Sequence, residues 1–470
     1  MQKQALVRTP LAVLLTTLLT GCFSLAPDYE RPVAPVAQTW EHVPAVPEGT
    51  QAADEMPWRT FFTEIRLQQV IGMALDNNRD LRVTVLNIEK ARAQYQIQRA
   101  DLFPTITANG SGSAQRLPDD LSGTGSSMIV RQYSATLGFS AYELDFFGRV
   151  RSLRDAALER YLATEEAQRS ARISLVAEVA TTWLQLAADQ ERLKLAYDTQ
   201  QALKTSYELI QRRYELGTAS ALDALQAKTA FEEARANVAR YTALVDQDRN
   251  ALVLVVGAAV PDILLPDGLS AVPNTLQDFP VGMPSEVLVR RPDIVQAERS
   301  LRAANANIGA ARAAFFPSIT LTGGVGTASA SLDDLFKSGS GTWNFMPQIS
   351  LPIFDAGRLS ANLDVAKVER DISIAQYDKA IQQAFREVAD VLAERRTLTD
   401  RLDAQMIRAE ASSDAYKLAD ARYRSGVDNY LRVLDAQRTL YAAQGDLIDA
   451  SFSKTVNSVT FYKVLGGGWQ

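Results

Sequence analysis

Two proline-free stretches of the chain place apolar side chains three and four residues apart in alternation. The positions are Ile173, Val176, Ala180, Trp183 and Ala187 in the first stretch, and Tyr377, Ile381, Ala384, Val388 and Val391 in the second. This spacing lines one face of an α-helix, so each stretch is predicted to be helical. If helical between its flanking glycines, each would extend ~100 Å at ~1.5 Å per residue. Because one amphipathic helix cannot bury its own apolar face, we expect these helices to pack side by side.

Shorter runs alternate apolar and small polar side chains with the two-residue period of a β-strand. The apolar positions are Tyr133, Ala135, Leu137, Phe139 and Ala141, then Ile319, Leu321, Gly323 and Val325, then Trp343, Phe345, Ile349 and Leu351, with Ile106 and Ala108 in a weaker run. Aromatic and aliphatic side chains on one face with small polar ones on the other are typical of a membrane β-barrel wall. The alternative is a soluble sandwich sheet. In either case the pattern predicts four strands.

Four strands are too few to close a membrane barrel, since the smallest known barrels use about eight. After the N-terminal segment, no stretch reaches the ~18 uninterrupted apolar residues of a spanning helix. Backbone groups at an open sheet edge cannot stay unpaired in lipid. If this protein crosses a membrane, we therefore expect several chains to contribute strands to one barrel.

The chain contains two copies of one pattern. The recurring landmarks, first copy and then second, are Phe103-Pro104 and Phe316-Pro317, Gly148 and Gly357, and Gly217 and Gly426. The offset is 213 residues for the first pair and 209 for the other two, so the two glycines lie 69 residues apart in both copies. Each copy is predicted to run in the order helix, strand, strand, long helix, turn, helix.

Domain boundaries follow from this duplication and from the N-terminal sequence. We expect a signal peptide at 1–21, a lipidated extended segment at 22–65, a first repeat at 66–257, a linker at 258–285, a second repeat at 286–466 and a tail at 467–470. The segment 22–65 is rich in proline, and an unstructured tether is the alternative for it.

The first residues indicate secretion and lipidation. Lys3 and Arg8 precede an apolar run at 11–19, which is the pattern of a signal peptide. The run ends in Leu19-Thr20-Gly21-Cys22, which resembles a bacterial lipobox with Cys22 as the acylated residue. The alternative is an ordinary signal peptide with an incidental cysteine. Cys22 is the only cysteine, which excludes a disulfide within the chain, a thiolate metal site and a cysteine nucleophile.

Composition and charge narrow the function. The net charge of −6 leaves no basic surface for nucleic acid, and we expect no nucleic-acid partner. The only histidine, His42, lies in the proline-rich segment, and the sequence holds no nucleotide-binding loop, metal-ligand spacing or nucleophile elbow. We therefore expect neither an enzyme nor a cofactor.

Several motifs together resemble the TolC superfamily, and specifically the OprM/NodT lipoprotein branch of outer-membrane efflux factors. They are the lipobox, Arg291-Pro292-Asp293-Ile294, Phe316-Pro317-Ser318-Ile319, the segment from Pro352 to Arg358, the segment from Arg422 to Leu431, and Leu465 to Trp469. The resemblance implies an α+β membrane protein: a homotrimer with a 12-stranded β-barrel, four strands per chain, that continues into a 12-helix periplasmic α-barrel. It also implies an outer-membrane location with a lipid anchor at Cys22, and docking to a periplasmic adaptor and an inner-membrane pump of the RND type.

The same resemblance suggests a gate at the periplasmic mouth. By position, Asp223 and Tyr423 correspond to a polar contact between neighbouring coils, and Asp428 and Asp435 to carboxylates near the constriction. Arg432 stands where some relatives carry an acid, so it either weakens the carboxylate ring or pairs with it. Carboxylates repeated by threefold symmetry would bind cations and repel anions. The alternative is that these are solvated residues at a helix end.

Glycines and prolines mark the turns of both repeats. Two glycines are predicted to form the helix-turn tips and four residues the strand–helix junctions: Gly217 and Gly426, then Pro104, Gly148, Pro317 and Gly357.

The function that these patterns favour is the outer-membrane channel of a tripartite efflux system that exports drugs or other small molecules. The alternatives are a non-conducting coiled-coil envelope lipoprotein and a protein-export duct of the type I secretion kind. A general diffusion porin is disfavoured, because porins need no periplasmic helices. The sequence leaves open the substrates, the particular pump and adaptor, the resting aperture, and whether the adaptor meets the tip or the flank.

Overall fold

The structure is a computed structural model that describes residues 24–37, 56–123, 125–269 and 285–467. The chain divides into two compact units. Unit 1 comprises residues up to Val33 together with Asn87–Thr164 and Gln296–Tyr377, and unit 2 comprises Ala34–Leu86, Glu165–Val295 and Asp378–Gln470. Cys22 and His42 lie outside the described residues.

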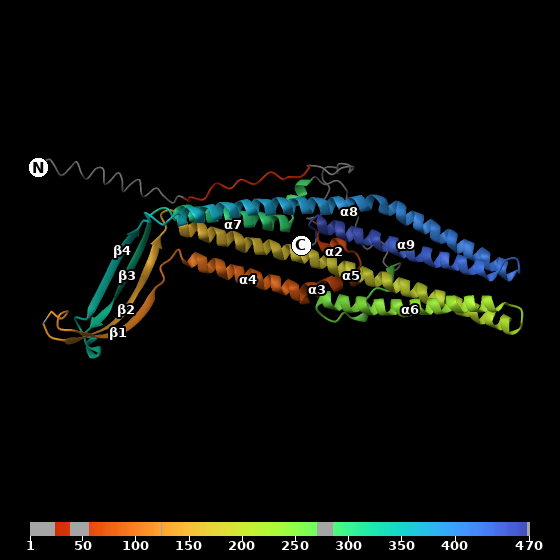
Figure 1. Cartoon of the computed structure of the whole chain (residues 1–470), viewed down its shortest axis with the longest axis horizontal. Helices are drawn as coiled ribbons and strands as arrows, with labels where there is room; N and C mark the ends of the chain where they lie inside the picture. The colour runs from red at the N-terminus through yellow and green to blue at the C-terminus, as the bar shows by residue number, and fades with distance from the viewer. Residues whose placement is uncertain (1–23, 38–55, 124, 270–284, 468–470) are drawn as a thin grey trace. The chain divides into compact units, whose positions relative to one another are not determined.

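Unit 1 contains the sheet and the helical segments attached to it. Its strands are β1 Thr107–Leu117, β2 Met128–Leu144, β3 Ser318–Ser329 and β4 Gly341–Ser350, its short 3₁₀ helix is η5 Leu332–Asp334, and it includes parts of α4 Arg79–Ala100, α5 Arg149–Glu215, α7 Pro292–Ala313 and α8 Arg358–Arg424. The four strands form one antiparallel sheet in the order β1-β2-β3-β4, side by side in Figure 1. The predicted count of four strands is confirmed.

The register places apolar and polar side chains on opposite faces of this sheet. One row across the strands reads Ala108, Leu137, Val325 and Trp343, and the next row reads Asn109, Thr136, Gly326 and Thr342. Residues directly opposite one another in antiparallel strands share a face, and successive rows alternate between faces. The sheet therefore has one apolar face and one face of small polar side chains, as the alternation predicts.

A β-bulge corrects the predicted alternation of β2. The register shifts between Phe139 and Tyr142, and Ala141 adopts a left-handed φ of 52°. After the shift Tyr142 lies opposite Leu321, so Tyr142 and not Ala141 continues the apolar face. The sequence prediction of Ala141 on this face was wrong, because an extra residue in one strand reverses the side-chain parity beyond it.

The N-terminal residues of unit 1 lie along α7. Glu298 is only 3% exposed and accepts hydrogen bonds from Arg31 at 2.7 Å, from Tyr29 at 3.2 Å and from Arg302 at 2.7 Å. Burial raises the pKa of Glu298, but the hydrogen bonds from Arg302 and Arg31 outweigh burial and hold it below its ordinary value. The Asn305 amide also donates to the Pro27 carbonyl oxygen at 2.7 Å.

Unit 2 is helical. Its elements are α2 Trp58–Phe61, α3 Ile65–Asn77, the first residues of α4 and α7, the larger part of α5, α6 Ala221–Val256, the 3₁₀ helices η2 Asp262–Leu264 and η4 Ser285–Arg290, the larger part of α8, and α9 Tyr430–Val464. The Phe61 and Tyr462 rings stack with centroids 4.1 Å apart, and the Tyr462 hydroxyl donates to the Met56 carbonyl oxygen. The Trp183 indole donates to the Leu264 carbonyl oxygen at 3.0 Å, so this buried aromatic donor has a partner.

The two long helices predicted from hydrophobic spacing are confirmed. Helices α5 and α8 each contain 67 residues. All ten positions that predicted them are buried, from Trp183 at 0% exposed to Val391 at 7%. Among the described residues, no helix is both long and apolar enough to cross a membrane.

Gly257 lies where the end of α6 closely approaches the backbone at the end of α3. It ends α6 with a φ of 77°, and a Cβ there would lie 2.5 Å from the Asn77 carbonyl oxygen. We expect Gly257→Ala to lower the free energy of unfolding by about 1–3 kcal/mol, since it combines left-handed strain with a backbone clash. Gly72→Ala is the control, because its Cβ meets nothing within 4 Å and alanine favours the helix. Denaturant unfolding of both variants measures the difference; equal stabilities would contradict the close approach.

Candidate functional site: the helix turns of unit 2 and the sheet of unit 1

The turn between α5 and α6 closes with two backbone hydrogen bonds. The amide of Gly217 donates to the Tyr214 carbonyl oxygen at 2.9 Å, and the amide of Thr218 donates to the Arg213 carbonyl oxygen at 2.8 Å. Gly217 has a φ of 72°. This is a Schellman motif, in which a left-handed residue lets the last helical carbonyls find donors.

The turn between α8 and α9 repeats this geometry. The amide of Gly426 donates to the Tyr423 carbonyl oxygen at 3.0 Å, and that of Val427 to the Arg422 carbonyl oxygen at 3.0 Å. Gly426 has a φ of 74°. The two turns lie at the same end of unit 2 (Figure 1).

The helices that follow the turns begin with different caps. Ser220 and Asp223 form a capping box: the Asp223 amide donates to the Ser220 hydroxyl at 3.0 Å, and the Asp223 carboxylate accepts from the Ser220 amide and hydroxyl. Asn429 caps α9 by accepting from the Arg432 amide. At the repeat offset of 209, Asn429 matches Ser220 and Arg432 matches Asp223. Only the first copy therefore carries the acid that completes a capping box.

An apolar cluster joins the two helical hairpins next to the turns. Its buried members are Leu203, Ile210, Ala224, Ala227, Ala230, Ala234, Tyr430, Val433 and Leu434. Tyr423 packs against the cluster with its ring centroid 5.4 Å from that of Tyr430. The Arg213 guanidinium donates to the Tyr423 hydroxyl at 3.2 Å. A side chain of α5 thus fixes Tyr423 at the end of α8.

The structure places Asp223 and Tyr423 with different partners. Within the described part of this single chain, the hydrogen bonds of the Asp223 carboxylate go to Ser220, and that of the Tyr423 hydroxyl goes to Arg213. Among the hydrogen bonds of the described residues, none joins Asp223 to Tyr423 within one chain.

The three other predicted gate residues lie around the second turn. Asp428 is paired with Arg422 at 2.6 Å, and this hydrogen bond holds the pKa of the Asp428 carboxyl below its ordinary value. Arg432 and Asp435 are exposed on the first turns of α9. The second turn and the start of α9 therefore present an ion-paired carboxylate at Asp428, then an exposed cation at Arg432 and an exposed carboxylate at Asp435.

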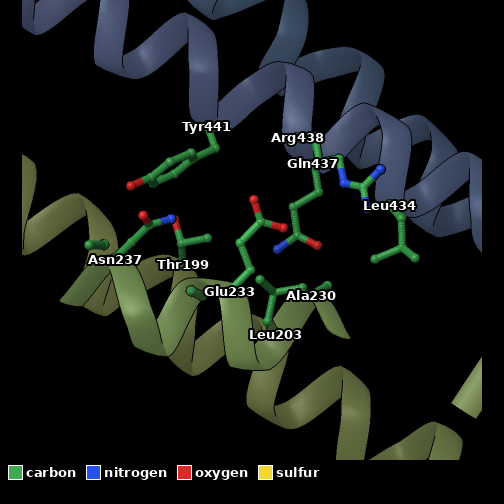
Figure 2. Close-up of a pocket in the computed structure, with 11 residues that line it drawn as sticks. Thr199, Leu203, Ala230, Glu233, Asn237, Leu434, Gln437, Arg438 and Tyr441 are labelled. Atoms are coloured by element: carbon green, nitrogen blue, oxygen red, sulfur yellow. The ribbon is translucent and has the colours of Figure 1, made fainter. Parts of the chain in front are cut away.

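A small open pocket of about 60 Å³ lies between α5, α6 and α9 and is lined in part by members of the apolar cluster (Figure 2). Ala230, Leu203 and Leu434 supply apolar lining, and the Gln437 amide points into the space near the Glu233 carboxylate. Burial raises the pKa of the Tyr441 hydroxyl at its edge to about 12, so this phenol is neutral at ordinary pH.

In unit 1, the sheet exposes its apolar face and both of its edges. Leu137 is 53% exposed, Val325 62% and Trp343 76%. Because the order is β1-β2-β3-β4, strands β1 and β4 each pair on one side only within the described chain. Such a sheet is stable only when other strands pair with its two edges and an apolar environment covers its apolar face.

The predicted strand–helix junctions lie between the elements as follows. Pro104 lies between α4 and β1, Pro317 between α7 and β3, and Gly148 and Gly357 immediately before α5 and α8 with φ values of 74° and 86°. Next to the first glycine, Arg149 pairs with Glu143 of β2 at 2.5 Å.

Sequence reasoning missed several contacts at the turns. The Ser220-to-Asp223 spacing was a readable capping signal. The pairing of Arg213 with Tyr423 carried no such signal, because 210 residues separate them and only the packing of the two hairpins brings them together.

The sequence is similar to a protein family and to individual efflux proteins over most of its length. A family model described as "Outer membrane efflux protein" matches residues 70–258 and 283–467. The antibiotic efflux pump outer membrane protein ArpC of Pseudomonas putida is 51% identical over 469 residues, which covers 99% of this chain and 96% of ArpC. The toluene efflux pump outer membrane protein TtgC, also of Pseudomonas putida, has the same identity and coverage.

The fold also matches a solved channel. The open state of the MtrE outer membrane channel of Neisseria gonorrhoeae superposes with a TM-score of 0.85 at 39% sequence identity. The match covers 95% of this chain and 99% of the MtrE chain.

The cap of α6 makes a local prediction. Ser220→Ala removes the side chain that accepts from the Asp223 amide, so we expect a loss of about 1 kcal/mol in local stability. Hydrogen exchange of the first turn of α6 measures this loss as faster exchange at 221–224. Thr229→Ala, whose hydroxyl bonds within the middle of α6, is the control and should leave that turn unchanged. Unchanged exchange in Ser220→Ala would mean that the cap contributes nothing to the helix start.

Proposed function

The chain belongs to the outer membrane efflux protein family of the TolC superfamily, and on that premise we propose that three copies form one gated export channel. The observation that carries this proposal is the sheet of unit 1, with two unpaired edges and an exposed apolar face. The chain is the outer-membrane component of an efflux system.

Completion of the sheet supports the trimer. In lipid every backbone donor and acceptor needs a partner, and an open edge leaves a row of them unpaired. Pairing β1 of one copy with β4 of the next removes both edges, and three copies of four strands give a 12-stranded barrel. The row with Leu137, Val325 and Trp343 then faces lipid, and the row with Asn109, Thr136 and Thr342 lines the channel.

The long helices supply the second part of the duct. With α5, α6, α8 and α9 in each copy, three copies give a 12-helix barrel in the periplasm. The helix turns then form its periplasmic mouth, where a periplasmic adaptor and an inner-membrane RND-type pump would deliver cargo. The names of ArpC and TtgC mention antibiotics and toluene, and we propose small apolar or amphiphilic molecules of these kinds as cargo.

The gate is proposed to work between copies. Within one chain, Asp223 is hydrogen-bonded to Ser220 and Tyr423 to Arg213. A hydrogen bond between Asp223 of one copy and Tyr423 of the next copy would therefore form in addition to these two. Asp428 and Asp435 of three copies would narrow the mouth, with Arg422 and Arg432 reducing their charge.

Planar-bilayer conductance of the purified trimer tests the channel and the gate. We expect a small conductance for the wild type and a severalfold larger one for Tyr423→Phe with Asp223→Ala, because the double change removes the contact between copies. Ser220→Ala is the matched control: it weakens the same helix start but keeps the Asp223 carboxylate, so its conductance should stay small.

Three other conductance results for the wild type, the double variant and Ser220→Ala would change the proposal. Large conductance in all three proteins would discard the gate and keep the channel. Equal opening by Ser220→Ala would assign the effect to the cap. Silence in all three, from folded trimers, would favour a non-conducting envelope lipoprotein.

The lipid anchor is a separate proposal that rests on Cys22. Cys22→Ala should abolish incorporation of labelled palmitate, because the acylated thiol is lost. The labelled band and membrane fractionation measure this, with wild type as the reference. Label retained in the variant would place the acyl chains elsewhere.

A further inference from the structure

Asn78 and Arg291 of unit 2 join the starts of α4 and α7 to the ends of other helices. Asn78 stands immediately before α4, and its side-chain amide donates to the Val255 carbonyl oxygen near the end of α6 at 2.7 Å. Arg291 stands immediately before α7, and its guanidinium donates to the Val464 carbonyl oxygen at the end of α9 at 2.7 Å. Each donor satisfies a carbonyl that its own helix leaves without a partner.

The two contacts occupy the same place in the two copies of the repeat. Asn78 and Arg291 are 213 residues apart, which is the offset of the two Phe-Pro landmarks. Val255 and Val464 are 209 residues apart, which is the offset of the glycine landmarks. Both copies therefore place a side-chain donor at the same joint between helices.

A left-handed glycine brings the backbone close to the donor residue at each joint. Gly257 has a φ of 77°, and a Cβ there would lie 3.1 Å from the Asn78 Cα. Gly466, which matches Gly257 at the offset of 209, has a φ of 84°, and a Cβ there would lie 3.4 Å from the Arg291 Cγ. The duplicated glycines thus support the same reading as the duplicated hydrogen bonds.

The second joint is ionic and includes a third helix. Arg291 is only 8% exposed, and besides Val464 it donates to Asp293 of α7 at 2.7 Å and to Glu387 of α8 at 2.9 Å. A planar guanidinium presents its N–H donors in a fixed fork, so this one side chain holds three helices in a defined geometry. Asn78 is uncharged, so the joint of the first copy cannot form such an ion pair.

We propose that Arg291 is a positioning residue for the gate, because it holds both helices of the hairpin that carries Tyr423. This inference rests on the proposed gate between copies. Glu387 lies 36 residues before Tyr423 on α8, and α9 has 35 residues between the second turn and the joint. At ~1.5 Å per residue, both helices extend ~50 Å from the joint to the turn. A small tilt at the joint therefore moves Tyr423 out of reach of a hydrogen-bond partner on the next copy.

Loss of the guanidinium removes all three contacts of the second joint. In Arg291→Gln the carboxylates of Asp293 and Glu387 lose their cation, and water solvates them because both are more than a third exposed. The variant keeps at most a neutral donor to Val464, as in the first copy. Arg291→Lys retains the charge but replaces the fork by a single ammonium, so its effect is expected to be smaller.

Planar-bilayer conductance of the full-length trimer tests the effect on the gate. We expect Arg291→Gln to raise the conductance severalfold, and Arg291→Lys to raise it less. Glu387→Gln should also raise it less, and it carries the test if Arg291→Gln fails to assemble, since it retains the buried arginine. Arg299→Gln is the matched control: it removes an arginine of the same helix that pairs with Glu159, outside the joint, and should leave the conductance unchanged.

The open double variant, Tyr423→Phe with Asp223→Ala, separates positioning from a general loosening of the helices. Arg291→Gln should add nothing to the conductance of this variant, because the contact that Arg291 positions is already absent. A further increase in the triple variant, or an equal increase in Arg299→Gln alone, would overturn the positioning role.

Hydrogen exchange at the second turn tests the joint without conduction. The backbone amides of residues 422–428 should exchange severalfold faster in Arg291→Gln than in the wild type, and at the wild-type rate in Arg299→Gln. Unchanged exchange at the turn in Arg291→Gln would overturn the inference. A freely conducting wild type together with faster exchange in Arg291→Gln would discard the gate and keep the joint as what fixes the turn, so the two failures are distinguishable.

Discussion

Unpaired backbone groups at the edges of one sheet are the constraint on which the assembly of this protein depends. The four strands of unit 1 satisfy one another internally, but β1 and β4 each leave one side open. Side chains cannot pair these open edges, because each edge needs a row of backbone amides and carbonyls from another strand. The apolar face of the sheet, on which Trp343 is 76% exposed, likewise needs surroundings that shield it from water. Both demands are met together if identical chains complete a closed wall.

In unit 2, side-chain packing stabilises the helices, and capping hydrogen bonds stabilise the turns between them. Small residues such as Ala224, Ala227 and Ala230 let the hairpins approach closely, and Tyr430 fills the space between them. The Schellman motifs at Gly217 and Gly426 satisfy carbonyls at the ends of the two long helices through backbone amides, and at the first turn the Thr218 hydroxyl also donates to the Arg213 carbonyl oxygen. Side chains at the turns pair within the chain as well, Arg422 with Asp428 and Arg213 with Tyr423.

The two repeats have diverged where their helices begin. Ser220 with Asp223 makes a reciprocal cap, whereas Asn429 with Arg432 makes a one-way cap and presents a cation at the matching position. The two turns therefore share a backbone and differ in charge.

Hydrophobic periodicity by itself determined the two long helices, the four strands and their apolar face, because burial of one face is a local property repeated along the chain. The turn glycines were equally local, since left-handed turns restrict residue type within a few positions, and the Ser220 cap was local as well although sequence reasoning missed it. Tertiary structure alone decided the bulge at Ala141, the hydrogen bond from Arg213 to Tyr423 and the hydrogen bonds from Arg192 to both Asp189 and Asp449. These depend on register and on packing between segments far apart in sequence, and no local pattern encodes which side chain of one helix will face which of another.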